Sequence, residues 1–99
     1  FDLSNANKVS LDVYVPSSSI TGSQDNKLWV KLQDGSKERP WEGQVTKEKA
    51  IELDKWQYLE FDFSDQKDQT AFSRLLLQFN GENNNDQVTA YVDNIFIHR

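Results

Sequence analysis

Apolar and polar residues alternate with a period of two along most of the chain, a pattern typical of β-strands that bury one face. The clearest example is the segment 9–15, in which Val and Leu occupy every odd position. The segments 28–33 and 58–63 show the same alternation. The pattern predicts six strands in all, over 9–15, 28–33, 44–53, 56–63, 74–80 and 88–97.

Two local features interrupt the alternation. In the last predicted strand the inward apolar positions change parity at Asp93 and Asn94, which indicates a β-bulge there, with Ile95 and Ile97 both expected to face inward beyond it. The polar stretch 64–70 is compatible with a helical turn, and the segment 81–86 has the composition of a surface loop.

The length and the strand pattern favour one all-β domain. A chain of 99 residues forms one domain at most. Several short strands without a long amphipathic helix are typical of an antiparallel β-sandwich. No apolar run is longer than three residues, as in the three leucines at 75–77, so we expect no membrane insertion.

The charge balance excludes several classes of partner. The net charge is −5, with 16 acidic and 11 basic residues, whereas nucleic acids and anionic membranes attract basic surfaces. The charge balance is compatible with neutral ligands. Aromatic residues make up 12% of the chain, which suits sugar binding.

The residue types needed for common catalytic sites are scarce. There is no Cys, and His98 is the only His, which excludes thiolate chemistry and leaves no basis for a Ser-His-Asp triad. Acid pairs such as Glu60 and Asp62 arise by chance among 16 acids, so they are a weak signal of glycosidase chemistry. We therefore expect no enzyme activity from the chain itself.

Three segments resemble a known family. Residues 55–64 read KWQYLEFDFS, residues 91–97 read YVDNIFI, and FDLS at 1–4 precedes the strand at 9–15. They resemble strands of galactose-binding-like jelly-roll carbohydrate-binding modules, which stand beside catalytic domains in bacterial polysaccharide-degrading enzymes. The resemblance implies an antiparallel two-sheet jelly-roll β-sandwich, with the strands 9–15, 56–63 and 88–97 in one sheet and the other three in the second.

Such modules have further strands ahead of the one that begins at residue 9. Residues 1–99 would then form a single carbohydrate-binding module that corresponds to the C-terminal two thirds of a longer one. The strands 74–80 and 88–97 would become sheet edges, which natural sandwiches normally cover. Because Phe1 stands just before a strand, we expect the missing strands upstream of it, or else in a second chain supplied in trans or in a swapped copy of this one.

The predicted pairing of 28–33 with 74–80 places two outward rows side by side. Sugar recognition needs an aromatic face that stacks on a pyranose, together with amides and cations that bond the sugar hydroxyls. The two rows contain a Trp, amides and cations in this way. Trp41, in a polar loop, is a further candidate because loops often carry function. The expected ligand-binding residues are Trp29, Lys31, Gln33, Trp41, Arg74, Gln78 and Asn80.

An alternative interpretation of Trp29 is that it packs across the strands under a loop. Exposure and geometry decide between the two: if Trp29 and Trp41 are both exposed and roughly coplanar with a groove, the module binds glycan, and if both are buried, a protein-interaction role gains. The resemblance also implies that Trp56 is a packing residue. On the other sheet's outer face, Tyr58 and Glu60 join Asp12 and Tyr14, which we interpret as a solvated surface.

The resemblance further implies that Asp93 helps to bind a structural Ca²⁺ ion, a cation that takes six to eight oxygen ligands. The alternative is a bulge residue whose carboxylate bonds local backbone N–H groups.

The expected function is non-catalytic binding of a polysaccharide or oligosaccharide, such as β-linked mannan or glucan. The module would serve a linked catalytic domain of a glycoside hydrolase or polysaccharide lyase, in a secreted or cell-surface bacterial protein. The alternative is a structural or protein-interaction β-sandwich of a cell-surface protein.

Overall fold

The computed structural model describes residues 2–80 and 86–99. Phe1 and most of the loop expected over 81–86 lie outside the described residues. The six strands and two short 3₁₀ turns are β1 (Lys8–Tyr14), η1 (Ser17–Ser19), β2 (Lys27–Gln33), β3 (Val45–Ala50), β4 (Gln57–Asp62), η2 (Ser64–Gln66), β5 (Arg74–Phe79) and β6 (Tyr91–His98). None of the described helical segments is long and apolar enough to cross a membrane.

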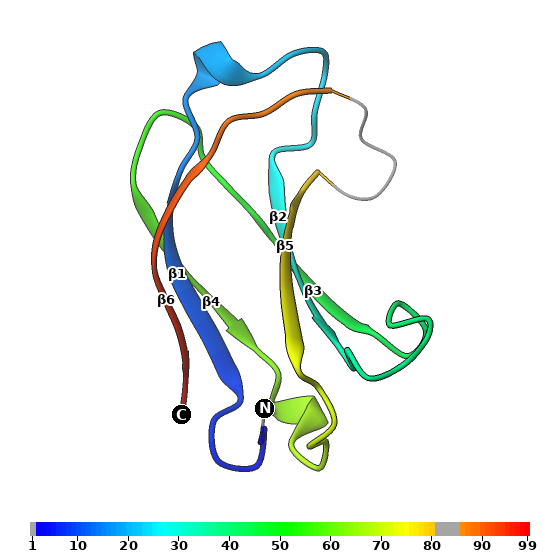
Figure 1. Cartoon of the computed structure of the whole chain (residues 1–99). Helices are drawn as coiled ribbons and strands as arrows, with labels where there is room; N and C mark the ends of the chain where they lie inside the picture. Colours follow the sequence, from blue (N-terminus) through cyan, green and yellow to red (C-terminus); the bar gives the residue numbers. More distant parts are fainter. Residues whose placement is uncertain (1, 81–85) are drawn as a thin grey trace.

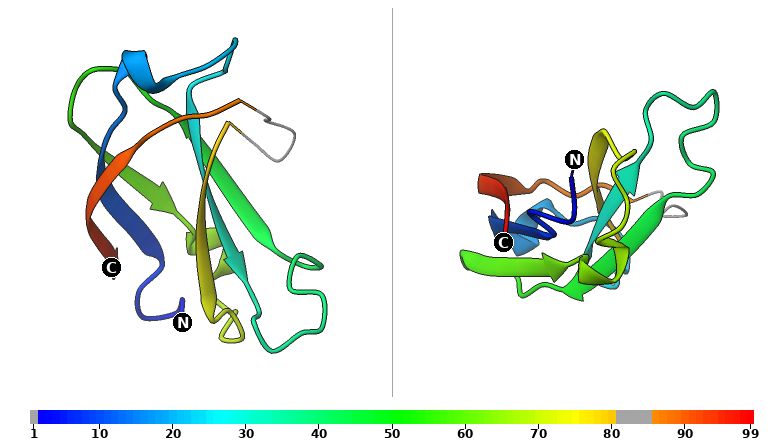
Figure 2. Two further views of the ribbon diagram at one scale, coloured as in Figure 1. Left: turned by 45° about the horizontal axis from the view of Figure 1, so that its top comes forward. Right: turned by 90° about the horizontal axis from the view of Figure 1, so that it is seen from below.

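The strands form two antiparallel three-stranded sheets, ordered β4-β1-β6 and β3-β2-β5. The sheets lie face to face as two layers (Figure 1 and Figure 2). The predicted all-β, antiparallel two-sheet sandwich is confirmed, and the division of the strands between the sheets is the one that the jelly-roll resemblance implies. Within the described residues, β5 pairs only with β2, and β6 pairs only with β1.

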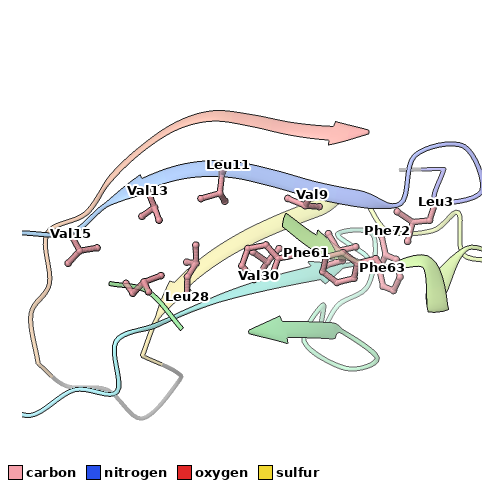
Figure 3. Close-up of a cluster of buried hydrophobic side chains, with 12 residues drawn as sticks. Leu3, Val9, Leu11, Val13, Val15, Leu28, Val30, Phe61, Phe63 and Phe72 are labelled. Carbon is pink, nitrogen blue, oxygen red and sulfur yellow. The ribbon is translucent and has the colours of Figure 1, made fainter. Parts of the chain in front are cut away.

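The core lies between the two central strands. In β1 and β2 the alternating apolar side chains are fully buried and point toward one another across the sandwich (Figure 3). Each Val, Leu or Phe removed from water in this way contributes about 1.5–3 kcal/mol to folding. The buried apolar residues are Leu3, Val9, Leu11, Val13, Val15, Leu28, Val30, Leu32, Ile51, Phe61, Phe63 and Phe72.

The predicted bulge in β6 is confirmed. The register between β1 and β6 shifts between Ser10 and Asp12, and Asn94 adopts a left-handed conformation with φ of 52°. Beyond the bulge Ile97 packs against the core, whereas Ile95 is 47% exposed, so the expectation that both are inward fails for Ile95. The extra residue at the bulge leaves the side chain beside it without a place in the core.

The last strand begins later than its sequence pattern suggests. β6 starts at Tyr91, although Val88 and Ala90 still pack against the core. The backbone N–H of Thr89 donates a hydrogen bond to Ser19 Oγ (3.2 Å), and the N–H of Thr21 donates to the carbonyl of Gln87 (3.1 Å). This segment therefore follows the connection after β1 instead of a sheet ladder.

A carboxylate fixes the turn between β3 and β4. Asp54 has φ of 64°, a conformation that Asp and Asn tolerate better than other non-glycine residues. Its Oδ1 accepts the N–H of Ser17 (2.8 Å), and its own N–H donates to the carbonyl of Val15 (2.9 Å). The turn that leads into β4 is thereby tied to the end of β1.

Candidate functional site

The predicted outward row on the β3-β2-β5 sheet is assembled as expected. In the register between β2 and β5, Trp29 lies opposite Gln78 and Gln33 lies opposite Arg74. Because directly opposite residues in an antiparallel pair project from the same face, these side chains share the outer surface of the sheet. We call this surface the β2 face.

The β2 face is closed at its centre, which differs from the accessible platform that we expected. Lys31 is 5% and Gln33 7% exposed, and Trp29 is half-buried. The Lys31 ammonium lies 5.7 Å from the centre of the Trp29 ring, and Gln33 Nε2 donates to Gln44 Oε1 (2.7 Å). The Lys31 and Gln33 side chains are therefore engaged in contacts within the protein, and they are not open to a ligand.

Asn80 has a structural role at the end of β5. Its Oδ1 accepts the N–H of Lys27 (2.9 Å), its own N–H donates to the Lys27 carbonyl (2.9 Å), and its Nδ2 donates to Gln24 Oε1. With φ of 63° it ends β5 in a left-handed turn. Both ends of its side-chain amide are occupied, so the predicted ligand role of Asn80 finds no support in this geometry. Of the row on β5, Arg74 is exposed and Gln78 half-buried.

Trp41 stands apart from the β2 row. It is 60% exposed in the connection 34–44, which extends beyond the β2–β3 hairpin (Figure 1), and its neighbour Pro40 is buried. A hollow of about 480 Å³ in the same connection is lined, among the described residues, by the charged side chains Lys37, Glu38, Arg39 and Glu42. Trp41 is thus exposed while Trp29 is half-buried, so the exposure criterion favours neither a glycan role nor a protein-interaction role.

The β2 face contains a buried hydrogen-bond donor that is unsatisfied among the described residues. Trp29 Nε1 is buried and has no hydrogen-bond partner among the described residues. A buried donor without an acceptor typically costs about 1–3 kcal/mol.

The opposite outer surface, on the β4-β1-β6 sheet, carries a row of aromatic side chains, of which the outer two are exposed and the central one is half-buried. Trp56 is 55% and Tyr91 55% exposed, and Tyr14 lies between them. The ring centroids are 5.7 Å apart for Trp56 and Tyr14, and 6.4 Å apart for Tyr14 and Tyr91. Neighbouring rings are tilted by 45° and 57°. We call these three residues the aromatic row.

Our expectation that Trp56 packs into the core is wrong. Phe61 and Phe63 of the same segment are buried, and the alternation that turns them inward turns Trp56 and Tyr58 outward. Gln57 holds this end of the strand in place, because its Oε1 accepts the N–H of Glu52 (3.2 Å) and its Nε2 donates to the Glu52 carbonyl (2.8 Å).

A hollow of about 310 Å³ lies against the aromatic row, lined by Asp12, Trp56, Gln57, Tyr58 and Asp93. In the register Asp12 of β1 lies opposite Tyr58 on one side and Asp93 on the other. The bulge residue Asn94 links the two acids: its Nδ2 donates to Asp12 Oδ2 (2.8 Å), and its N–H donates to Asp93 Oδ1 (2.8 Å). The hollow therefore combines aromatic faces with two fixed carboxylates.

Asp93 thus makes the local backbone bond that we considered as the alternative to calcium binding. Among residues 2–80 and 86–99, no three His, Cys, Asp or Glu side chains are grouped closely enough to hold a metal ion. A structural Ca²⁺ ion bound by Asp93 stays a prediction, which melting with and without a chelator would test.

Comparisons with protein-family models, with curated proteins and with solved structures give no match. The function is therefore inferred from the geometry and chemistry of the two outer faces.

Proposed function

We propose that this chain is a non-catalytic module that binds polysaccharide through the aromatic row Trp56, Tyr14 and Tyr91. The observation that carries the proposal is a line of three rings, two exposed and the central one half-buried, with one contributed near the end of each strand of a single sheet. Exposed aromatic faces that are held by a sheet stack on the apolar C–H faces of sugar rings with little loss of side-chain entropy.

The spacing of the rings supports a ligand that is a chain of sugars. Three rings at successive separations of 5.7 and 6.4 Å offer several contact points along one direction. Their tilts of 45° and 57° make a stepped surface, which follows a single twisted chain better than the flat face of a crystal. An internal stretch of a β-linked polymer such as mannan or glucan fits this description.

The polar groups beside the row suit sugar hydroxyls. Carboxylate oxygens of Asp12 and Asp93 accept O–H donors, and Tyr58 adds a phenolic oxygen whose hydrogen is donated to Glu60 Oε2 (3.1 Å). In this proposal the module belongs to a secreted or cell-surface bacterial enzyme, where it raises the concentration of a linked glycoside hydrolase or polysaccharide lyase domain on its substrate.

The test compares two exposed tryptophans on different faces. Affinity electrophoresis against a panel of soluble β-linked polysaccharides identifies a ligand, and calorimetry then measures its affinity for Trp56→Ala and Trp41→Ala. We expect Trp56→Ala to lose about 2 kcal/mol of binding free energy, a typical value for a hot-spot Trp. Trp41→Ala should bind as the parent does.

Trp56 and Trp41 are 55% and 60% exposed, so the two variants are matched in the surface that they remove. Weakened binding in Trp41→Ala with full affinity in Trp56→Ala would move the site to the 34–44 connection. Absence of binding to every glycan in the panel would reject the proposal.

A second candidate function is a structural or protein-interaction role, and the outer side of β6 favours it. Within the described residues β6 has a ladder partner on one side only, and Ile95 and Phe96 are 47% and 59% exposed. An open edge with apolar side chains is suited to pairing with another segment or chain. Concentration-dependent association in sedimentation experiments that is lost in Phe96→Lys would support this role.

A further inference from the structure

The hollow beside the aromatic row has an uncompensated negative charge. Asp12 and Asp93 each use one carboxylate oxygen to accept a hydrogen bond from Asn94. Among the described residues, neither acid forms an ion pair with a Lys or Arg side chain. Both side chains line the hollow, where a ligand would meet them.

The charge of the surrounding surface has the same sign. The outward positions of the β4-β1-β6 sheet carry four acids, which are Asp12, Glu60, Asp62 and Asp93. The register places one ammonium on the same surface, that of Lys8, and it lies 3.7 Å from Glu60 in an ion pair. The field over the hollow therefore attracts cations and repels carboxylates and sulfates.

The aromatic lining favours the same kind of ligand. Trp and Tyr faces attract an ammonium group through the ring quadrupole, most strongly for Trp. In the hollow, Trp56 and Tyr58 stand beside the acids, so one group placed there meets both kinds of attraction. A neutral hydroxyl would gain the hydrogen bonds alone, and a uronate would be repelled.

From this combination we infer that the hollow receives a protonated amino group of a glycan, so that the preferred ligand is a β-linked polymer containing glucosamine residues. The inference rests on the proposed function, since the aromatic row would hold the sugar backbone. The ammonium group forms charge-assisted hydrogen bonds with the free oxygens of Asp12 and Asp93. It also lies against the ring of Trp56.

The test uses three β-1,4-linked oligosaccharides of equal length that differ only at carbon 2. One carries free amino groups (glucosamine), the second acetylated amino groups and the third hydroxyl groups (glucose). Calorimetry at low salt is expected to give an affinity about 10-fold higher for the amino form than for either neutral form. The preference should shrink as the salt concentration rises, because screening weakens exposed ion pairs.

Two variants test whether the amino group binds at Asp12 and Asp93. Asp12→Asn and Asp93→Asn each keep a side-chain oxygen that can accept the bond from Asn94, so both should melt close to the parent. Each is expected to lose most of the preference for the amino form. Asp68→Asn removes one charge in the segment after η2, at the other end of the sandwich (Figure 1), and should retain the preference.

The outcomes separate the two proposals. Equal affinity for all three oligosaccharides would overturn amine recognition and leave glycan binding in place, whereas no binding to any of them or to the polysaccharide panel would overturn both. If Asp68→Asn lost the preference for the amino form as much as Asp12→Asn and Asp93→Asn do, the preference would arise from the net charge of the protein. That result would overturn the hollow as the binding site of the amino group. Displacement of the sugar by an oligolysine peptide at the same concentration would assign the hollow to peptide amines and overturn the glycan assignment.

Discussion

The tryptophans on the two outer faces of the sandwich differ in how far they are exposed to solvent. Trp29 projects from the central strand of its sheet, is half-buried and has the Lys31 ammonium over its ring. Trp56 stands just before an outer strand, and its nearest ring partner is Tyr14. A side chain on a central strand is flanked by neighbours on both sides, which long Lys and Gln chains can cover. The comparison teaches that facing outward is not the same as being accessible.

The largest expected effect tests whether Trp29 serves the fold. Trp29→Ala should lower the free energy of unfolding by about 2 kcal/mol, less than a fully buried Trp would cost because the ring is partly exposed and its Nε1 is unpaired. Urea denaturation measures this, with Trp56→Ala as the comparison, which should lose less than about 1 kcal/mol. Glycan affinity that falls in Trp29→Ala at unchanged stability would restore the β2 face as the binding site.

A smaller effect is expected at the centre of the aromatic row. Tyr14→Ala removes the ring that lies between Trp56 and Tyr91 and should weaken glycan binding about 10-fold. Tyr14→Phe keeps the ring and should stay within about 2-fold of the parent, since stacking uses the ring face. Calorimetry on both variants separates stacking from bonding by the phenolic hydroxyl. Equal losses in the two would show that the hydroxyl carries the contact.

The smallest effect concerns the turn that leads to Trp56. The hydrogen bond from the Ser17 N–H holds the pKa of Asp54 below its ordinary value. A carboxylate with a lowered pKa in the folded state stabilises the protein fully above its unfolded value of about 3.9, and this stabilisation is lost as the pH falls through the folded-state pKa.

Asp54→Asn keeps a residue that tolerates φ of 64° but removes the charged acceptor. We expect a slightly lower melting temperature at neutral pH, and a difference from the parent that fades in acid. Thermal melts across pH measure this. A difference that stays constant down to the lowest pH would show that the charge of Asp54 is irrelevant to the turn.

Most of the fold could be predicted from the period of two, because burial of the central strands dictates strict alternation at positions such as Val9, Leu11 and Val13. The parity change also located the bulge. The late start of β6 could not be predicted, since Val88 and Ala90 alternate as strand residues do while the backbone between them bonds to Ser19.

The candidate site could be predicted less well, for two separate reasons. The parity of the segment 58–63 already placed Trp56 outward, and only the family resemblance argued for the core; following the alternation would have found the aromatic row. The burial of Lys31 and Gln33 depends on contacts with Trp29 and Gln44, which only the structure supplies. The meeting of Asp12 with Asp93 likewise depends on the register.

The bulge at Asn94 has a consequence for how this surface tolerates change. β6 consists of two half-strands of opposite parity, joined by one additional residue. If the strand alternated strictly from Asp93 onward without a bulge, Phe96 would turn toward the core and Ile97 toward solvent. Deletion of Asn94 would place Ile95 alone opposite Leu11 and leave the faces of Phe96 and Ile97 unchanged, but it would remove the residue that links Asp12 and Asp93.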